Sequence, residues 1–250
     1  MSEIKQPRLK TTASAQTGLT QDDVVYGHIF DAILEQRLPP NTKLNEEALG
    51  EIFGVSRTII RRALLRLSVE KIVNIRPNRG AIVASPSVEE AKQILKAREV
   101  LELAITELAV EHATSEQIES LRQLIIEEHQ AFEQGDHGRG IRLSCEFHIR
   151  LGDMANNSPL LSFQRSIVSQ TSLVIALYEA GTRSQCSFDE HNSLLDAIES
   201  GDKTKVLNLV KTHLEHIKSK LVLDEEAATK DLHAVFSDIM TKKQPIISNR

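Results

Sequence analysis

The 250-residue sequence has no tryptophan, and aromatic residues make up only 4% of it. Its core must therefore be built from Leu, Ile, Val and Ala, which favours helices over aromatic-rich β-sandwiches because these residues lose little entropy in a helix. No stretch approaches the ~18 uncharged apolar residues of a membrane helix, so no membrane partner is expected. The polar N-terminal residues lack the apolar segment of a secretory signal.

The two cysteines, Cys145 and Cys186, are too few for a disulfide framework. Without a visible secretory signal, the reducing cytoplasm is the expected compartment. The length of the chain predicts one or two domains. Composition and helix-breaking residues divide it into four expected segments: a flexible arm over 1–20, a first module over 21–85, a helical module over 86–226, and a C-terminal helix and tail over 227–250.

An excess of acidic residues gives the chain a formal net charge of −5, which taken alone argues against a nucleic-acid binder. The charge is unevenly divided, because residues 1–85 hold 12 Lys and Arg against 9 Asp and Glu, a balance of +3, and the remainder carries −8. Clustered basic residues are the footprint expected where phosphates are neutralised, and a solvated basic helix face is the alternative. Residues 55–80 contain one acidic residue, Glu70, and seven basic residues: Arg57, Arg61, Arg62, Arg66, Lys71, Arg76 and Arg79.

Hydrophobic periodicity predicts three helices in the first module, at about 22–34, 45–53 and 56–70. Gly54 supplies a tight turn between the second and third helices, and Leu49 and Ile52 of the second helix are expected to face inward. A short helix, a glycine turn and a second helix with a basic exposed side are typical of a helix-turn-helix. The first residues of that second helix enter the DNA major groove, where Arg binds guanine bidentately or grips phosphate.

Two short β-like runs follow, at 72–75 and 81–84, and the turn between them carries Arg76 and Arg79. This pattern predicts a β-hairpin with a basic tip, the wing of a winged helix. Gly80 can adopt a positive φ, which lets the backbone approach DNA closely. An ordinary surface hairpin is the alternative for this segment in isolation.

The first module resembles the winged helix-turn-helix of the GntR family of bacterial transcription regulators. The resemblance rests on Leu44-Asn45-Glu46, Gly54-Val55-Ser56-Arg57-Thr58, Arg61, Ala63-Leu64, Arg66-Leu67 and Arg79-Gly80-Ala81. Two positions depart from the family pattern, since Ile59 stands where Pro is common and Arg62 where Glu is frequent. The resemblance implies a set of DNA-contacting residues, with Arg62 on phosphate or solvent: Ser56, Arg57, Thr58, Arg61, Arg62, Arg79 and Gly80.

Helical periodicity continues through the second module without a credible strand. It predicts an all-α bundle of six or seven helices, large enough to bury its own core and an internal cavity. Six helices are placed at about 87–113, 115–134, 138–155, 159–180, 187–200 and 202–224.

Three histidines, His148, His191 and His213, lie on separate helices of largely apolar periodicity and can converge inside such a bundle. Satisfied core histidines are the alternative to a metal or acid site. Glu146 and Glu190 adjoin the first two histidines in sequence but are expected to point away from them.

The second module resembles the FCD effector domain of the FadR-type branch of GntR regulators, over about residues 90–222. The shared features are Arg98 with Glu102, Glu146-Phe147-His148, Glu190-His191 with Ala197-Ile198 and Gly201-Asp202, and His213-Leu214. In that branch three histidines, and an Asp one turn before the first, bind a divalent metal whose coordination small carboxylates complete.

The resemblance thus implies zinc or nickel on His148, His191 and His213. Ser144 stands at the position of the Asp, and serine is a poor ligand for these metals, so a metal-free cavity stays open as an alternative. An anionic effector is expected to contact Arg98 and the same three histidines. Arg98 could instead form a helix-face pair with Glu102.

The sequence as a whole predicts a mainly α protein: a winged helix-turn-helix with a small β-hairpin wing, followed by an all-α bundle. The expected function is a homodimeric, ligand-responsive regulator and not an enzyme. A repressor released from a palindromic operator DNA by a small organic acid is the leading hypothesis. The alternatives are a metal-dependent enzyme that uses the three-histidine cavity, and a DNA-binding protein without small-molecule control.

Overall fold

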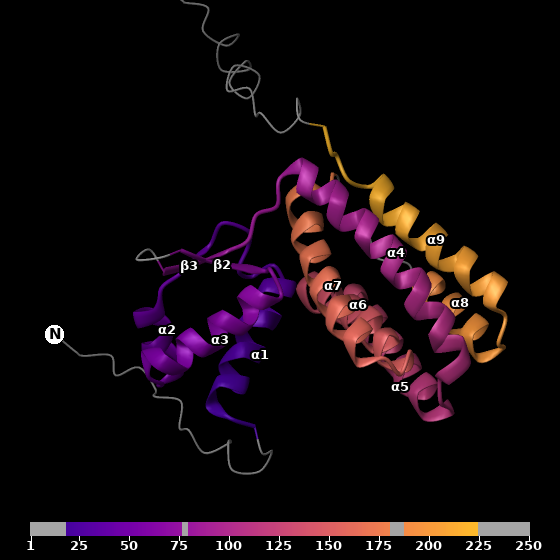
Figure 1. The fold of residues 1–250 in the computed structure, drawn as a ribbon, viewed down its shortest axis with the longest axis horizontal. Helices are drawn as coiled ribbons and strands as arrows, with labels where there is room; N and C mark the ends of the chain where they lie inside the picture. The colour runs from indigo at the N-terminus through magenta and orange to yellow at the C-terminus, as the bar shows by residue number, and fades with distance from the viewer. Residues whose placement is uncertain (1–18, 77–79, 181–187, 225–250) are drawn as a thin grey trace, which may run out of the picture.

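The structure, a computed structural model, describes residues 19–76, 80–180 and 188–224. Within these residues nine helices and three strands form two modules that lie side by side (Figure 1). Most of the predicted arm, the predicted C-terminal helix and tail, Arg79 and Cys186 lie outside the described residues.

The first module contains three helices and a small sheet. Asn45 begins the second helix, because its side chain accepts hydrogen bonds from the backbone N–H groups of Glu47 and Ala48. Gly54 ends that helix with φ 65°, a left-handed conformation that suits glycine. The elements are α1 (Gln21–Leu34), β1 (Lys43–Leu44), α2 (Glu46–Phe53), α3 (Arg57–Val69), β2 (Val73–Arg76) and β3 (Gly80–Val83).

The predicted hairpin is present as β2 and β3, which pair antiparallel with Val73 opposite Val83. A third strand, β1, pairs with the other edge of β3, so the sheet order is β1-β3-β2. This strand was not predicted, because two residues are too few to show the alternation that identifies a strand.

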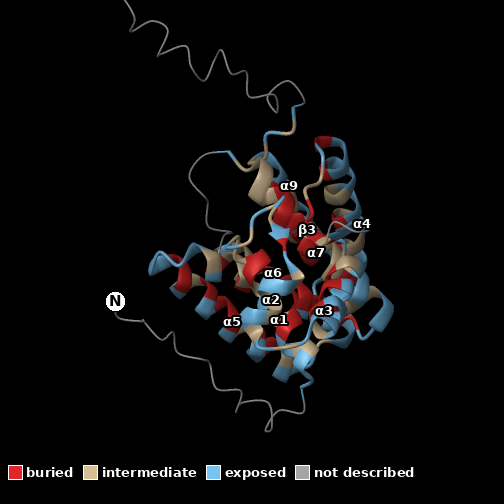
Figure 2. Cartoon of the chain, turned by 90° about the vertical axis from the view of Figure 1, so that its left-hand side faces the viewer, coloured by how far each residue is buried: buried red, intermediate tan, exposed pale blue. Residues whose placement is uncertain are grey.

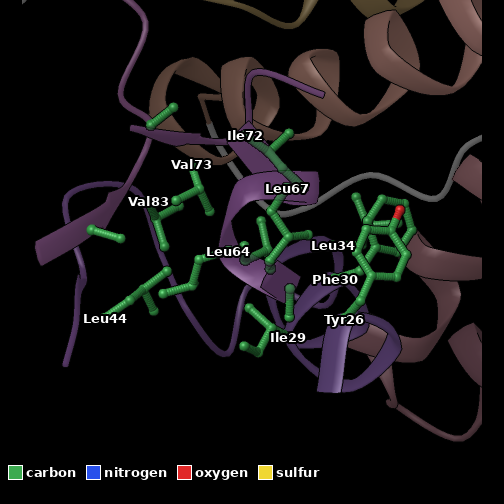
Figure 3. Packing of buried hydrophobic residues seen from close by; sticks show 14 of the residues in the cluster. Tyr26, Ile29, Phe30, Leu34, Leu44, Leu64, Leu67, Ile72, Val73 and Val83 are labelled. Carbon is green, nitrogen blue, oxygen red and sulfur yellow. The ribbon is translucent and has the colours of Figure 1, made fainter. Parts of the chain in front are cut away.

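The core of the first module packs α1 and α3 against the sheet (Figure 3). Ile60, Leu64 and Leu67 bring the inner face of α3 into it and are almost completely buried. The prediction that Ile52 faces inward is wrong, since Ile52 is 67% exposed. Leu49 packs against the core as predicted, together with Phe53 one turn later on α2.

The second module is the predicted all-α bundle, and its six described helices begin and end within about two residues of the expected positions, except that the last helix ends at Ser219, five residues before the expected end at 224. Ser87 begins the first of them with a capping box to Glu90. Buried residues occupy the helix sides that face one another, and exposed residues cover the outer sides (Figure 2). The helices are α4 (Val88–His112), α5 (Ser115–Glu133), α6 (His137–Met154), α7 (Ser158–Tyr178), α8 (Phe188–Glu199) and α9 (Lys203–Ser219).

Helix α7 is long and apolar enough, by length and composition, to cross a membrane. It lies instead against α4 and α6 inside the bundle. Several polar residues of α7 are buried there and hydrogen-bond within the protein, among them Gln164, Ser169 and Ser172. A core helix of a helical bundle passes the same test of length and composition.

The two modules contact each other through α1 on one side and α6 and α7 on the other (Figure 1). Cys145 and Ile149 of α6 belong to the same buried apolar cluster as the core of the first module. Arg142 Nε lies 3.1 Å from Glu35 Oε1, just beyond the end of α1. Helix α6 therefore joins the interior of the bundle to the first module.

Candidate nucleic-acid interface and metal centre

The exposed face of α3 borders a groove between this helix and the β2–β3 hairpin. The groove holds about 770 Å³ and is lined by Arg57 and Arg61 on the helix side. Arg76 and Gly80 line it on the hairpin side, and Gly80 has φ 76°. Ser56 precedes α3 as its N-cap residue, and both Ser56 and Thr58 are exposed. The predicted contact residues that the structure describes thus lie at the N-cap of α3, on α3 or at the start of β3.

Four arginines of α3 form ion pairs in two different directions. Arg57 Nη2 lies 2.7 Å from Glu47 Oε1, and Arg61 Nε lies 2.7 Å from Glu46 Oε2, both on α2. The remaining two turn towards the start of α1 and do not line the groove: Arg62 pairs with Asp22 at 2.8 Å and Arg66 with Asp23 at 2.7 Å. These partners were not predicted, because each arginine and its carboxylate lie 10 or more residues apart in the sequence.

His148, His191 and His213 meet inside the bundle, as their positions on separate helices suggested. They come from α6, α8 and α9, and each is at most 3% exposed. One nitrogen of each ring lies within 4.8 Å of the others. His148 Nε2 and His213 Nε2 are 3.2 Å apart.

Each histidine of this cluster has a carboxylate beside its other ring nitrogen. His191 Nδ1 lies 2.9 Å from Glu128 Oε2 on α5, and His213 Nδ1 lies 2.6 Å from Glu190 Oε2 on α8. His148 Nδ1 lies 3.0 Å from Glu102 Oε2 on α4, within ion-pair distance but without the alignment of a hydrogen bond. Carboxylates behind histidine ligands fix the tautomer and orientation of the rings in metal sites.

The prediction that Glu190 points away from the histidines is wrong. It points away from its neighbour His191, as expected for adjacent helix residues, but reaches His213 on α9 and also His216 at 2.5 Å. Glu128 and Glu102 were not predicted as partners of His191 and His148. No spacing rule links residues on separate helices, so the sequence alone offered no signal for them.

Burial keeps two of the rings neutral. Burial lowers the pKa of His148 far below its usual range, although Glu102 opposes this, and burial also lowers the pKa of His213. Burial alone would raise the pKa of Glu102, but Arg98 and His148 outweigh it and hold that pKa below its usual range. The hydrogen bond from His213 lowers the pKa of Glu190 to about 2. Neutral histidines beside ionised carboxylates are the state that binds a metal.

The arrangement of protons makes the cluster fit a cation. An ionised carboxylate only accepts hydrogen bonds, so the protons of His191 and His213 belong on Nδ1 and their lone pairs on Nε2. Glu102, 3.0 Å from His148 Nδ1, favours the same tautomer for His148. The Nε2 lone pairs of His148 and His213 then face each other at 3.2 Å. His191 Nε2 is buried and has no hydrogen-bond partner among the described residues. Three converging lone pairs without a shared proton are the donor set of a metal site.

The formal charges of the cluster also favour a bound cation. Three carboxylates, Glu102, Glu128 and Glu190, stand against the single guanidinium of Arg98, which leaves a formal charge of −2 with neutral imidazoles. Two of these carboxylates, Glu102 and Glu128, are at most 2% exposed, and buried charges need partners. One divalent cation balances this charge, so the residues present fit zinc or nickel although Ser144 offers no carboxylate.

A cavity of about 50 Å³ lies beside the cluster. Arg98, Ser144, Cys145 and His148 line it on one side, and apolar residues such as Ile217 line the other. Of the four residues predicted to bind an effector, Arg98 and His148 thus reach the cavity, whereas His191 and His213 do not line it. The predicted Arg98–Glu102 pair also forms, with Arg98 Nε 2.6 Å from Glu102 Oε1.

Comparisons with known proteins identify both modules. Residues 21–83 match the family model described as bacterial regulatory proteins, gntR family, and residues 93–216 match the FCD domain model. The Uxu operon regulator of Haemophilus influenzae is 26% identical over 81% of this chain and 80% of its own length. The transcriptional regulator LutR of Bacillus subtilis is 25% identical over 74% of this chain and 93% of its own.

A solved structure, that of Escherichia coli McbR/YncC, has the same fold, with a TM-score of 0.72 at 23% identity. The superposition covers 80% of this chain and 96% of that one. The named relatives are transcription regulators and not enzymes.

Proposed function

The chain belongs to the GntR family of bacterial regulatory proteins and carries their FCD domain, and on that premise we propose that it releases a palindromic operator when a small carboxylate enters the cavity of its bundle. Its class, a DNA-binding transcription regulator, follows from the family. Repression, the homodimer, the cytoplasmic location and the carboxylate are parts of the proposal. The observation that carries it is that α6 lines the cavity with Ser144 and His148 and also contacts α1, with Ile149 in the apolar cluster that forms the core of the first module.

At the DNA end, α3 is proposed to enter the major groove with Arg57, Thr58 and Arg61. Their exposure and the groove beside α3 support this assignment. Arg62 is proposed to contact phosphate, once it leaves Asp22. Arg79 lies outside the described residues and remains predicted to contact DNA. Two copies related by a two-fold axis would place two such helices on a palindromic operator.

In the bundle, His148, His191 and His213 are proposed to hold a zinc or nickel ion, supported by their converging Nε2 atoms and by the formal charge of the cluster. The metal would act as a Lewis acid towards an oxygen of the effector. Arg98, His148 and Ser144 would position that effector, because all three line the cavity. The small side chain of Ser144 leaves room for an effector carboxylate next to His148.

Helix α6 would transmit effector binding from the cavity to the DNA-binding module. An effector biases the DNA-binding modules only if it binds one of their arrangements better than the other. The cavity and the contact with α1 share this helix, so a shift of α6 that improves contact with the effector also changes its contact with α1.

DNA binding is tested with the double variant Arg57→Ala/Arg61→Ala and fluorescent duplexes from the region upstream of the protein's own gene. Binding should be lost while the melting temperature stays unchanged, because both side chains are exposed. Arg139→Ala/Arg150→Ala, which removes two exposed arginines of α6, is the matched control and should bind normally. Full affinity in the first variant would overturn the assignment of α3.

Metal and effector binding are tested by elemental analysis and by thermal shift with a panel of small organic acids, with and without chelator. We expect about one equivalent of zinc or nickel in the wild type and in His112→Asn, an exposed histidine, and far less in His191→Ala. An acid should raise the melting temperature only when metal is present. Stabilisation without metal would indicate a metal-free cavity, and no stabilisation by any acid would favour DNA binding without small-molecule control.

A further inference from the structure

Two glutamates at the start of α2 face two arginines at the start of α3, across the turn of the helix-turn-helix. Glu46 accepts a hydrogen bond from Arg61 Nε at 2.7 Å, and Glu47 lies 2.7 Å from Arg57 Nη2. The two pairs differ in exposure. The side chain of Glu46 is 23% exposed, whereas that of Glu47 is 66% exposed.

The backbone between these helices fixes the position of Glu46. Asn45 caps α2, and Glu46 is the first residue of that helix. At the other end, Val55 N–H donates to the carbonyl of Gly50 at 3.1 Å, and Gly54 turns the chain with φ 65°. A partly buried carboxylate on a capped helix loses little entropy when it holds a partner. Most exposed ion pairs lack this advantage and contribute little.

The hydrogen bond leaves a particular edge of Arg61 for a ligand. Arg61 uses Nε for Glu46, and its terminal Nη atoms form the edge that binds guanine O6 and N7 bidentately. Both residues line the groove between α3 and the hairpin, and Arg61 itself is 71% exposed. The bond thus fixes the guanidinium at the surface where DNA is proposed to bind.

We propose that Glu46 is a positioning residue that aims Arg61 at one base pair of the operator. The proposal rests on the proposed DNA binding by α3 and adds to it an assignment of which arginine reads sequence. Arg57, whose partner Glu47 is open to solvent, is free to turn to the phosphate backbone. Arg62 and Arg66 are held by Asp22 and Asp23 outside the groove.

Removal of the Glu46 charge should separate specificity from affinity. An arginine without its carboxylate partner can rotate to phosphate, which carries no sequence information. The loss of a negative charge beside DNA also reduces repulsion, so binding to any sequence strengthens. Glu46→Gln should therefore bind scrambled DNA more tightly and discriminate less. Glu47→Gln, the matched control on the adjacent residue, should also bind scrambled DNA more tightly but should discriminate between sequences as the wild type does.

The experiment is selection of the full-length protein from random duplexes, followed by affinities for the selected duplex and for each single base-pair change. The wild type should select a palindrome. Glu46→Gln should lose on the order of tenfold discrimination at one base pair per half-site, and Arg61→Ala should lose discrimination at the same base pair. The double variant Glu46→Gln/Arg61→Ala should discriminate at this base pair as well as Arg61→Ala alone does, since both substitutions remove the same contact between Arg61 and the base pair.

Four outcomes decide the question. Loss at the same base pair in Glu46→Gln and Arg61→Ala, with Glu47→Gln unchanged, supports the proposal. Full discrimination in Glu46→Gln overturns it while DNA reading by the protein stands. Loss at every position, or an equal loss in Glu47→Gln, overturns it in favour of a general effect on α2. A wild type that selects no sequence overturns both this proposal and the proposed function.

Discussion

Glu128 on α5 lies 2.9 Å from His191 Nδ1 on α8, and the two side chains are at most 2% exposed. A carboxylate in this position raises the basicity of the ring and holds its Nε2 towards the other histidines. The proposed metal site thus depends on residues from helices that provide no ligand.

Glu128→Gln should weaken zinc binding about 10- to 100-fold. The amide oxygen can still accept a hydrogen bond from His191 Nδ1, so the ring keeps its place, but the compensating charge is lost. Competition with a coloured chelator measures the affinity. Glu127→Gln removes an exposed carboxylate that pairs with Arg139, and it should bind zinc like the wild type. Equal affinities in the two variants would contradict a role for Glu128.

Acid should destabilise the metal-free protein between about pH 6.5 and 5. Burial lowers the pKa values of His148 and His213 in the folded state, so the unfolded chain takes up protons in this range that the folded protein does not. The free energy of unfolding then falls as the pH falls, by at most about 1.4 kcal/mol per pH unit for each histidine.

Melting temperatures in the presence of a chelator, taken at half-unit steps of pH, test this. His213→Asn should show a shallower decline, because one of the two protons is no longer taken up, and the exposed His112→Asn should match the wild type. A decline of the same slope in all three proteins would point to other groups.

Arg142→Ala should loosen the contact between the two modules. Arg142 pairs with Glu35 across the interface, and the two side chains are 27% and 19% exposed, so the loss is about 1 kcal/mol. Hydrogen exchange should become faster in α1 while the interior of the bundle stays protected. Arg139→Ala, on the same helix but paired with Glu127 inside the second module, is the control and should leave α1 unchanged. Unchanged exchange in Arg142→Ala would show that the apolar contacts suffice.

Local features of this protein could be predicted from sequence, because they depend on neighbours in the chain. Helix periodicity located the six helices of the bundle, and Gly54 marked the turn between α2 and α3. The three histidines were found because each lies on an apolar helix and the family resemblance ordered them.

What escaped prediction depends on contacts between distant segments. The ion pairs from Arg61 to Glu46 and from Arg62 to Asp22 form only after the helices pack, and no periodicity encodes them. The same holds for Glu128, whose helix contributes no histidine to the cluster. Glu190 was misplaced because its orientation was judged against its sequence neighbour His191, whereas its partner His213 comes from the next helix.

Ser144→Asp should raise the affinity for zinc, because position 144 is one helical turn before His148 and both residues line the cavity. A carboxylate there adds an oxygen ligand and a negative charge next to the three imidazoles. Without metal the same carboxylate is buried in a small cavity, and the melting temperature should fall below that of the wild type. Zinc should then raise the melting temperature by more than it does in the wild type.

The matched control is Ser172→Asp, which places a carboxylate on α7 in the wall of the same cavity, at a serine that is equally buried but has no histidine one turn later. It should lose stability without metal as Ser144→Asp does and gain no extra stabilisation from zinc. If the two variants respond to zinc alike, the effect comes from charge in the cavity and not from coordination. Because an aspartate at 144 would occupy the space proposed for the effector, Ser144→Asp should also lose its thermal shift with organic acids.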